Sequence, residues 1–308
     1  MEFLYFLEGL RTPLGDAFFS LITHLGEETL FIIAGLLVFW CIDKLQGYYL
    51  LIVGLTGTVI NQFLKLWFRI PRPWVKDPNF TIVESARAEA TGYSFPSGHT
   101  QSSVGIFGAV ARWNKQIAVR TICVAVCVLV PLSRMYLGVH TPSDVGVSIA
   151  VALILIIGIY PLLQKGAKNP KIMRMIMLFM LVISVTYVVF VEFYAFPSDI
   201  DMANLENGTK NAYTMLGCIF GLWLTYEVDS RFIQFRTDAL WWAQILKLVL
   251  GLAILMAIKA GVKSPLMALT GGHHVADTIR YFAMVAFAGC IWPLTFEFWQ
   301  GLGQRKYL

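Results

Sequence analysis

Long apolar stretches alternate with short polar segments along most of the chain. A helix needs about 20 predominantly apolar residues to cross a bilayer. Stretches that approach or exceed this length cover residues 28–43, 45–68, 98–114, 116–138, 143–164, 172–194, 211–228, 239–260 and 277–299. The pattern therefore predicts an all-α, polytopic transmembrane helix bundle with about nine spans. The span over 239–260 carries a lysine, Lys247, in its middle.

The N-terminal segment has a different pattern. Glu8, Arg11 and Asp16 interrupt its apolar residues at helix-like spacing, so we expect residues 1–27 to form interfacial helices rather than a span. No basic segment follows Met1, and we expect no cleaved leader.

Composition supports a membrane protein and excludes other classes. Of the 308 residues, 57% are apolar and 14% are charged, whereas soluble domains have about 25% charged residues. The net charge is +5, but the basic residues are dispersed between the apolar stretches, so a nucleic-acid partner is not expected. The five cysteines lie within apolar stretches without a paired CxxC motif, which argues against disulfides and against zinc.

Basic residues are distributed unevenly between the two sides of the predicted bundle. One side carries twelve basic and five acidic residues, and its basic residues are Lys44, Arg112, Lys115, Arg120, Lys165, Lys168, Lys171, Arg174, Arg231, Arg236, Arg305 and Lys306. Cytoplasmic loops carry an excess of Lys and Arg, so we expect this side to face the cytoplasm. The loops 69–97 and 139–143 then lie outside the cytoplasm.

The first group of candidate functional residues follows the span over 45–68. Lys65, Arg69 and Arg72 are spaced to share one helical face, and three cations on one face attract an anion. A lysine at a span end also commonly extends its side chain to the interface without binding anything. The prolines on both sides of Arg72 favour the binding interpretation, because they end the helix and fix the backbone at the guanidinium.

The second group opens the span over 98–114. Ser97 is a candidate N-cap, and Gly98 allows the backbone to approach a ligand closely. Helix N-termini bind phosphate through free N–H groups. On its own, Pro96-Ser97-Gly98-His99 is equally consistent with a simple helix cap followed by a solvated histidine.

The third group lies around the start of the span over 143–164. His140 and Asp144 are four residues apart, so the carboxylate can reach one ring nitrogen of the histidine. That contact would fix the tautomer and leave the other nitrogen free to attack a substrate. Ser133 and Arg134 precede this pair, and ionisable groups at span ends are functional candidates.

Together, the three groups resemble the signature of the type 2 phosphatidic acid phosphatase and vanadium haloperoxidase superfamily, in its membrane lipid phosphatase branch. The order and spacing agree at every position: Lys65 with six residues to Arg72-Pro73, then Pro96-Ser97-Gly98-His99, then Ser133-Arg134 with five residues to His140 and three to Asp144. The resemblance covers about residues 28–164. It says little about residues 172–308. From the predicted spans we expect a phosphatase core of six spans over 28–194, followed by a three-helix membrane extension over 195–308.

The resemblance also implies the chemistry. Members hydrolyse phosphoric monoesters or diphosphates through a phosphohistidine, without a metal or other cofactor. By this likeness, His140 is the nucleophile, Asp144 orients it, and His99 protonates the leaving oxygen and later activates water. The phosphoryl group would be held by Lys65, Arg72, Ser97, Gly98 and Arg134. Phosphoryl transfer depends on positioning and on stabilising oxygen charge, and three fixed cations can supply what a metal supplies elsewhere.

A site at the membrane face suits an amphiphilic substrate. We expect a lipid phosphate or an isoprenoid diphosphate, such as phosphatidic acid, phosphatidylglycerol phosphate or undecaprenyl pyrophosphate, in a bacterial cell membrane. One alternative is a sugar phosphatase similar to glucose-6-phosphatase, which also has nine spans and an outward-facing site. Another is a protein that binds or transports a phospholipid without turnover, although such a protein has no use for a nucleophile with its orienting carboxylate.

Overall fold

The structure is a computed structural model that describes residues 1–302. Helices and turns account for all of its regular structure, and no strand occurs within this range. The prediction of an all-α protein is confirmed. Arg305 and Lys306, which contribute to the predicted cytoplasmic charge, lie outside the described residues.

The chain folds into two compact units. The first unit contains Met1–Ile32, Ile52–Pro161 and Phe190–Asn211. The second contains Ile33–Leu51, Leu162–Val189 and the chain from Ala212 onward. Several long helices contribute residues to both units, so the units do not coincide with the predicted segments 1–27, 28–194 and 195–308, and that division stays a prediction.

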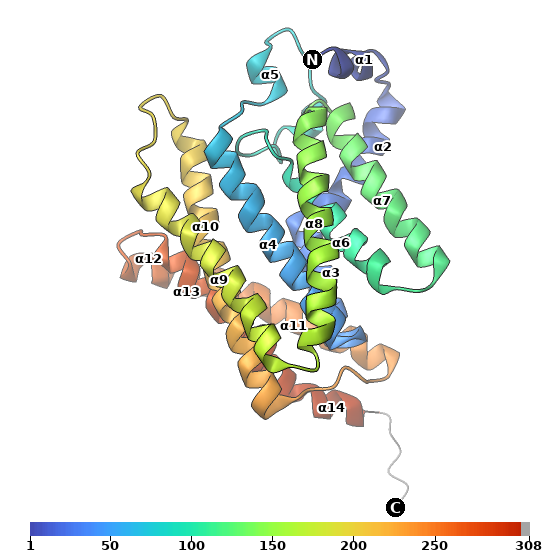
Figure 1. Cartoon of the computed structure of the whole chain (residues 1–308), viewed down its shortest axis with the longest axis vertical. Helices are drawn as coiled ribbons and strands as arrows, with labels where there is room; N and C mark the ends of the chain where they lie inside the picture. Colours follow the sequence, from blue (N-terminus) through green and yellow to red (C-terminus); the bar gives the residue numbers. More distant parts are fainter. Residues whose placement is uncertain (303–308) are drawn as a thin grey trace, which may run out of the picture. The chain divides into compact units, whose positions relative to one another are not determined.

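The first unit holds all of the motif residues. Figure 1 labels the helices of the chain. The helices of the first unit, some of which continue beyond the unit, are α1 (Glu2–Gly9), α2 (Pro13–Thr23), α4 (Lys44–Phe68), α5 (Pro73–Lys76), α6 (Gly98–Trp113), α7 (Ile117–Tyr136), α8 (Pro142–Gly166) and the start of α10 (Met202–Val228). A short 3-10 turn, η1 (His24–Gly26), follows α2. Helices α6 and α7 pack along each other, and α2 packs on α7.

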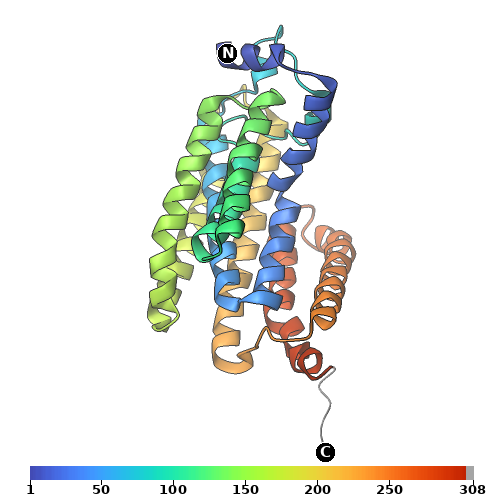
Figure 2. The same ribbon diagram turned by 90° about the vertical axis from the view of Figure 1, so that its right-hand side faces the viewer.

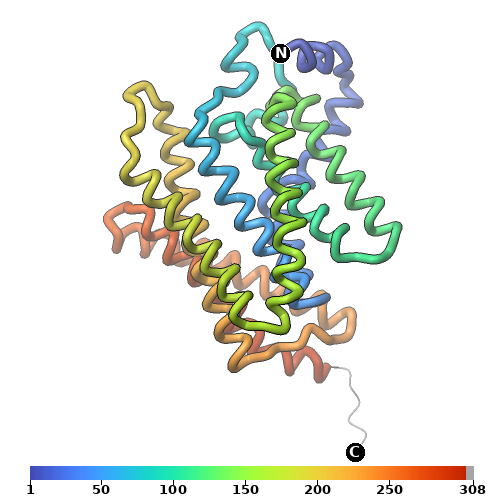
Figure 3. The backbone as a smooth tube through the Cα atoms, in the orientation of Figure 1, coloured from blue at the N-terminus to red at the C-terminus, as the bar shows by residue number. Residues whose placement is uncertain are grey.

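The N-terminal helices are fastened to the long loop between α5 and α6, which Figure 3 traces as a tube. The Tyr5 hydroxyl donates to Asp77 at 2.8 Å, and a Glu8 carboxylate oxygen accepts from the Thr81 amide at 3.0 Å. Arg11 donates to the Thr81 carbonyl at 2.9 Å. These contacts fix the loop that later carries several residues of the site.

The second unit contains most of the C-terminal third. Its further elements are α3 (Glu28–Leu37, which begins in the first unit), η2 (Val38–Ile42), α9 (Pro170–Phe193), η4 (Asp229–Ile233), α11 (Trp241–Gly261), α12 (Lys263–Leu269), α13 (Val275–Ala286), η5 (Phe287–Ile291), η6 (Trp292–Thr295) and α14 (Phe296–Gly301). Lys247 is fully buried in α11 and donates to the Trp40 carbonyl at 2.8 Å. Its charged head is therefore hydrogen-bonded to backbone within this unit, which explains how a lysine is tolerated inside the helix.

Within residues 1–302, six helical segments are long and apolar enough to cross a membrane: Lys44–Lys76, Ile117–Tyr136, Pro142–Gly166, Pro170–Phe193, Trp241–Leu269 and Val275–Gly301. A seventh is possible if Pro13–Gly26 and Glu28–Ile42, which meet at 51°, form one broken span (Figure 2). The predicted count of about nine is thus not confirmed. Helices occur at all nine predicted positions, but α6 has only 16 residues and α10 begins with a polar stretch. The span that carries Lys247 is among the six.

Candidate active site

The phosphate-binding candidates at the end of α4 are held by main-chain carbonyls of the loop before α6. Lys65 Nζ donates to the Tyr93 carbonyl at 2.5 Å. The Arg72 guanidinium donates to the carbonyls of Gly92 at 3.1 Å and Thr91 at 2.7 Å. A guanidinium has a planar, fixed set of donors, so these bonds orient Arg72 before any substrate arrives.

The predicted helical face shared by Lys65, Arg69 and Arg72 is wrong. Helix α4 ends at Phe68, and Arg69 has a left-handed backbone with φ of 52°. Its side chain turns back to the Leu66 carbonyl at 3.1 Å. The proline after Ile70 prevents helix continuation, so Arg72 lies beyond the helix while Arg69 is not part of the site.

The start of α6 has the predicted capping geometry. The Ser97 Oγ accepts from the Thr100 amide at 3.4 Å, which makes Ser97 the N-cap. The Ser97 amide donates to the Asp144 carbonyl at 3.0 Å, and the Ser97 carbonyl accepts from Ser148 Oγ at 2.8 Å. These bonds fasten the N-terminus of α6 to the first turns of α8.

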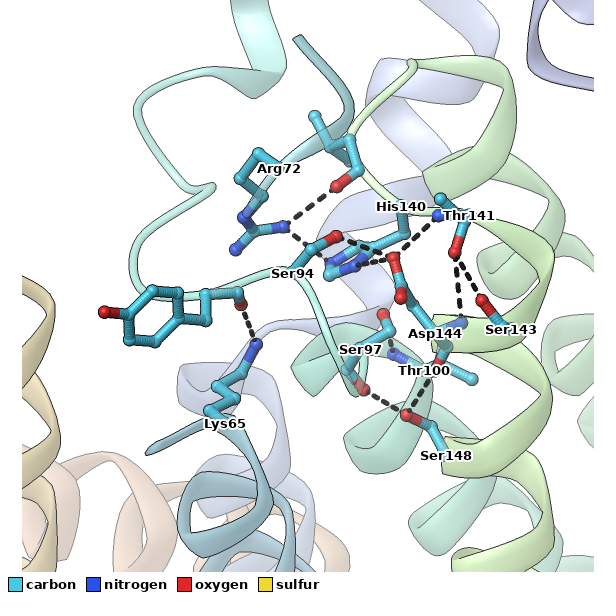
Figure 4. Close-up of polar contacts among 12 residues, drawn as sticks. Lys65, Arg72, Ser94, Ser97, Thr100, His140, Thr141, Ser143, Asp144 and Ser148 are labelled. Carbon is cyan, nitrogen blue, oxygen red and sulfur yellow. Dashed lines mark hydrogen bonds and ion pairs between the residues drawn. The ribbon is translucent and has the colours of Figure 1, made fainter. Parts of the chain in front are cut away.

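His140 precedes α8, and Asp144 lies in the first turn of that helix (Figure 4). His140 Nδ1 is 3.5 Å from Asp144 Oδ2, and both side chains are almost completely buried. The same carboxylate oxygen accepts from Ser94 Oγ at 2.6 Å and from the Thr141 amide at 2.7 Å. The predicted pair is therefore brought together, with Asp144 held in place by two further donors.

The hydrogen bonds also define which nitrogen of His140 can attack. Arg72 NH1 lies 2.9 Å from His140 Nε2, and a guanidinium can only donate. Nε2 must therefore be the acceptor, which places the ring hydrogen on Nδ1, facing Asp144. In this tautomer the Nε2 lone pair accepts the Arg72 hydrogen bond, and it is the tautomer that a nucleophilic role for His140 would require.

Arg134 is the third cation of the group. It is fully buried in α7, and its NH1 donates to Thr23 Oγ1 at 2.7 Å. Its Nε and NH2 have no hydrogen-bond partner among residues 1–302. These two donors are free to bind an anion.

The buried charges of the group do not balance. Lys65, Arg72 and Arg134 are each at most 6% exposed, and Asp144 is the buried carboxylate that faces them, at 1%. Among the fully buried groups, three cations and one anion leave a surplus of two positive charges. Glu89, which is 29% exposed and also lines the site, offsets part of this surplus at Arg134. Unpaired buried charges are costly, so the arrangement favours a bound dianion such as a phosphate monoester.

A cavity of about 200 Å³ lies next to these residues. Five of the eight predicted site residues line it: Lys65, Arg72, Gly98, His99 and His140. The other three, Ser97, Arg134 and Asp144, are fully or almost fully buried and do not line it. The cavity fits a phosphoryl group with part of the group attached to it.

Several contributors were not found from the sequence. The Gln101 side chain lines the cavity, and neither its nitrogen nor its oxygen has a partner among the described residues. Ser94 and Thr23 bond to Asp144 and Arg134 as described above. Gln101 lies two residues after His99 in the first turn of α6, so its proximity to the predicted site could have been read from the sequence. Nothing in the sequence around Thr23 pointed to Arg134.

Electrostatics keep both histidines neutral in the free protein. Burial, together with the Arg134 cation, lowers the pKa of His99 from 6.5 to about 4, although Glu89 opposes the shift. Burial and the Arg72 and Lys65 cations lower the pKa of His140 well below its ordinary value. A phosphate dianion at the same position would raise both pKa values.

Within the described chain, His24, Glu27 and Glu89 are the one group of three or more His, Cys, Asp or Glu residues at metal-ligand spacing. None of the three is among the eight predicted site residues. Glu89 lines the same cavity as His99.

Comparison with known proteins identifies the family. The PAP2 superfamily pattern matches residues 46–168, and the pattern described as PAP2 superfamily phosphatase, transmembrane extension, matches residues 213–305. The chain belongs to the PAP2 superfamily.

Its relatives carry phosphatase names. Phosphatidylglycerophosphatase B of Bacillus subtilis (strain 168) is 30% identical over 159 residues, which is 47% of this chain and 74% of the relative. Undecaprenyl-diphosphatase BcrC of the same organism is 34% identical over 124 residues, 39% of this chain and 61% of the relative. A probable sphingosine-1-phosphate phosphatase of Dictyostelium discoideum is 29% identical, over 48% of this chain and 38% of the relative. No solved structure matches the chain.

Proposed function

We propose that this protein is a metal-independent membrane phosphatase that hydrolyses a lipid phosphate or polyprenyl diphosphate through a phosphohistidine. The observation that carries the proposal is the surplus of two buried positive charges facing the oriented nucleophile His140. A binding protein needs the cations alone, whereas this site also holds the Nε2 lone pair of His140 in a defined direction.

In the first step, His140 Nε2 attacks phosphorus. A P–N bond forms as the bond from phosphorus to the leaving oxygen breaks, and His99 gives its proton to that oxygen. The proton on Nδ1 of His140 faces Asp144, so the carboxylate stabilises the positive charge that develops on the ring. The free donors of Arg134, with Arg72 and Lys65, neutralise the equatorial oxygens.

In the second step, neutral His99 takes a proton from water. The resulting hydroxide attacks phosphorus, the P–N bond breaks, and inorganic phosphate leaves. The bound dianion and Glu89, 3.4 Å from His99 Nε2, favour the protonated form of His99 in the first step. The leaving group departs with the proton that His99 donated. His99 is then neutral and can act as a base.

The substrate class follows from the surroundings of the site. The cavity is lined by the C-terminal half of α4, the start of α6 and His140, which precedes α8. Helices α4 and α8 are among the apolar segments that can cross a membrane. The relatives named above act, by their names, on phosphatidylglycerol phosphate, undecaprenyl diphosphate or sphingosine 1-phosphate. These substrates share a phosphoryl group on a long apolar chain, and we assign this chemistry to the present protein.

We place the site on the outer side of the membrane, the bacterial cell membrane in our proposal. The site lies at the start of α6 and the end of α7. Arg112, Lys115 and Arg120 lie around the connection at the other end of these two helices. Since basic loops remain in the cytoplasm, the site end faces away from it, and this argument does not depend on the total number of spans.

The sugar phosphatase alternative rested on nine spans and on an outward-facing site. The nine spans are not confirmed, since six or seven segments qualify among the described residues, and an outward-facing site is shared with the lipid phosphatase that we propose. No other feature of the site favours a sugar phosphate over a lipid.

The test is phosphate release by detergent-purified protein with EDTA present. Phosphatidic acid, undecaprenyl diphosphate and glucose 6-phosphate are assayed in parallel, with His140→Ala as the control. We expect release from a lipid substrate, no release from the sugar phosphate, and loss of activity in the variant. Acid-labile, base-stable phosphate on the protein after rapid quenching would identify the phosphohistidine. Equal activity of His140→Ala would refute the mechanism.

A further inference from the structure

A cluster of metal-ligating groups lies at the edge of the catalytic cavity. Two of its three members, His24 and Glu27, have no part in the mechanism above. His24 Nδ1 contacts Glu27 Oε1 and lies 3.5 Å from Glu89 Oε1. The three ligand atoms lie within 4.8 Å of one another. A ring nitrogen carries at most one hydrogen, so it cannot donate to both carboxylates. Two carboxylates that converge on one nitrogen are better satisfied by a shared cation.

We propose that His24, Glu27 and Glu89 form a binding site for a divalent transition-metal ion of the Zn²⁺ type. Zinc binds imidazole nitrogen and carboxylate oxygen at about 2.0–2.2 Å in tetrahedral geometry, which separates neighbouring ligand atoms by about 3.4 Å. The 3.5 Å between His24 Nδ1 and Glu89 Oε1 fits this spacing. His24 Nδ1 and Glu27 Oε1 lie closer than this, in hydrogen-bond contact, so the Glu27 carboxylate has to move away from the ring for both to bind one ion. Mg²⁺ and Ca²⁺ prefer oxygen ligands throughout, so the imidazole selects against them.

The ligands are accessible to a metal ion from solvent. Their side chains are 54%, 35% and 29% exposed for His24, Glu27 and Glu89. Three protein ligands leave one coordination position open for water or another small ligand. The ion can therefore enter and leave without unfolding of the surrounding helices.

The cluster is coupled to the catalytic residues by direct contacts. Glu89 Oε2 is 3.4 Å from His99 Nε2, and Thr23, one residue before His24, accepts from Arg134. Gly26 packs so closely on α6 that a Cβ there would lie 2.8 Å from the His99 carbonyl oxygen. A metal that recruits Glu89 competes with His99 for this carboxylate. We therefore expect bound Zn²⁺ to inhibit phosphate release, a consequence that rests on the proposed function, whereas metal binding itself does not.

The site is not implied by the family match. His24 and Glu27 precede residue 46, where the PAP2 superfamily match begins. They come from the turn after α2, and Glu89 comes from the loop before α6. The fold brings these segments together within the first unit.

Binding is tested with the metal alone, on full-length protein freed of metal by a chelator. Equilibrium dialysis with Zn²⁺ measures stoichiometry and affinity, and the visible absorption of Co²⁺ reports tetrahedral coordination. We expect one ion per chain, and an affinity at least about tenfold weaker in His24→Ala. His273→Ala is the matched control, because His273 is an exposed histidine of the second unit that packs on Tyr213. Glu27→Gln removes a different ligand and gives an independent second test.

Phosphate release is then measured over a Zn²⁺ titration. We expect inhibition of the unmodified protein and of His273→Ala over the concentration range in which they bind the metal. His24→Ala should keep its metal-free activity and require at least about tenfold more Zn²⁺ for inhibition. Equal Zn²⁺ affinity of His24→Ala and the unmodified protein would overturn the site. Equal inhibition of both would overturn its coupling to catalysis and point to metal on the catalytic histidines. Binding that depends on His24 in a protein without turnover would instead count against the proposed function alone.

Discussion

Replacing Ser94 with alanine removes one of the two hydrogen bonds that hold the Asp144 carboxylate. The Ser94 hydroxyl donates to Asp144 Oδ2 at 2.6 Å, and the Thr141 amide supplies the other bond at 2.7 Å. Ser94 is 0% exposed and Asp144 is 1% exposed, so bulk water does not reach the vacated position. Asp144 then carries its charge with less support and holds His140 less firmly.

The size of the effect follows from the charge on the acceptor. A hydrogen bond to a charged group contributes about 1.5–3 kcal/mol. We expect this loss of free energy to fall on the transition state, in which the His140 ring becomes positive. Each 1.36 kcal/mol lost there lowers the rate tenfold. We therefore expect kcat to fall by about ten- to hundredfold, with little change in KM, because Ser94 does not line the cavity.

The assay is phosphate release at saturating and subsaturating lipid substrate, with two comparison variants. Ser148→Ala removes a hydroxyl of equal burial whose bonds go to the main-chain carbonyls of Ser97 and Asp144, at 2.8 and 3.0 Å. Ser148→Ala should lower the free energy of unfolding by about 1 kcal/mol. It should reduce kcat much less than Ser94→Ala does. Ser94→Thr keeps the hydroxyl and should recover part of the activity. The reasoning fails if Ser94→Ala retains more than half of kcat, or if Ser148→Ala loses as much.

Three further predictions test the charges and the packing. Because the pKa of His140 is lowered in the folded protein, only the unfolded chain binds a proton at this residue below about pH 6.5. The thermal midpoint without phosphate should therefore be lower at pH 5 than at pH 7, and the difference should be smaller in His140→Asn. Inorganic phosphate should raise the thermal midpoint, because it binds the surplus positive charge. Arg134→Gln should need about tenfold more phosphate for the same shift, because the variant loses charge-assisted donors. A phosphate response equal to that of the unmodified protein would contradict the assigned anion site. Gly217→Ala should lower the free energy of unfolding by about 1–3 kcal/mol, because its Cβ would lie 2.2 Å from the Thr278 carbonyl oxygen. In the same thermal melting experiment in detergent, Gly261→Ala should have almost no effect, because its Cβ would have no described atom within 4 Å.

The limits of sequence-based reasoning show most clearly in the membrane topology. Apolar periodicity located helices at all nine predicted positions, because each helix satisfies its own backbone hydrogen bonds within a continuous segment. It did not separate helices that cross a bilayer from those that do not. The 16-residue α6 packs on α7, and a helix packed against protein can be apolar without spanning. The length of a helix and the elements that surround it decide whether the helix crosses the bilayer.

The sequence alone predicted which residues form the candidate site, because the phosphatase signature resides in residue types at fixed spacings around helix ends. It predicted Lys65, His99 and His140, which line one cavity. Tertiary structure alone decided what holds them: Ser94 reaches Asp144 across 50 residues and Thr23 reaches Arg134 across 111. The same is true of His24, which meets Glu89 only because the turn after α2 folds against the start of α6. Local spacing determines which groups share a helix end, but hydrogen bonds between distant segments depend on packing that no local pattern encodes.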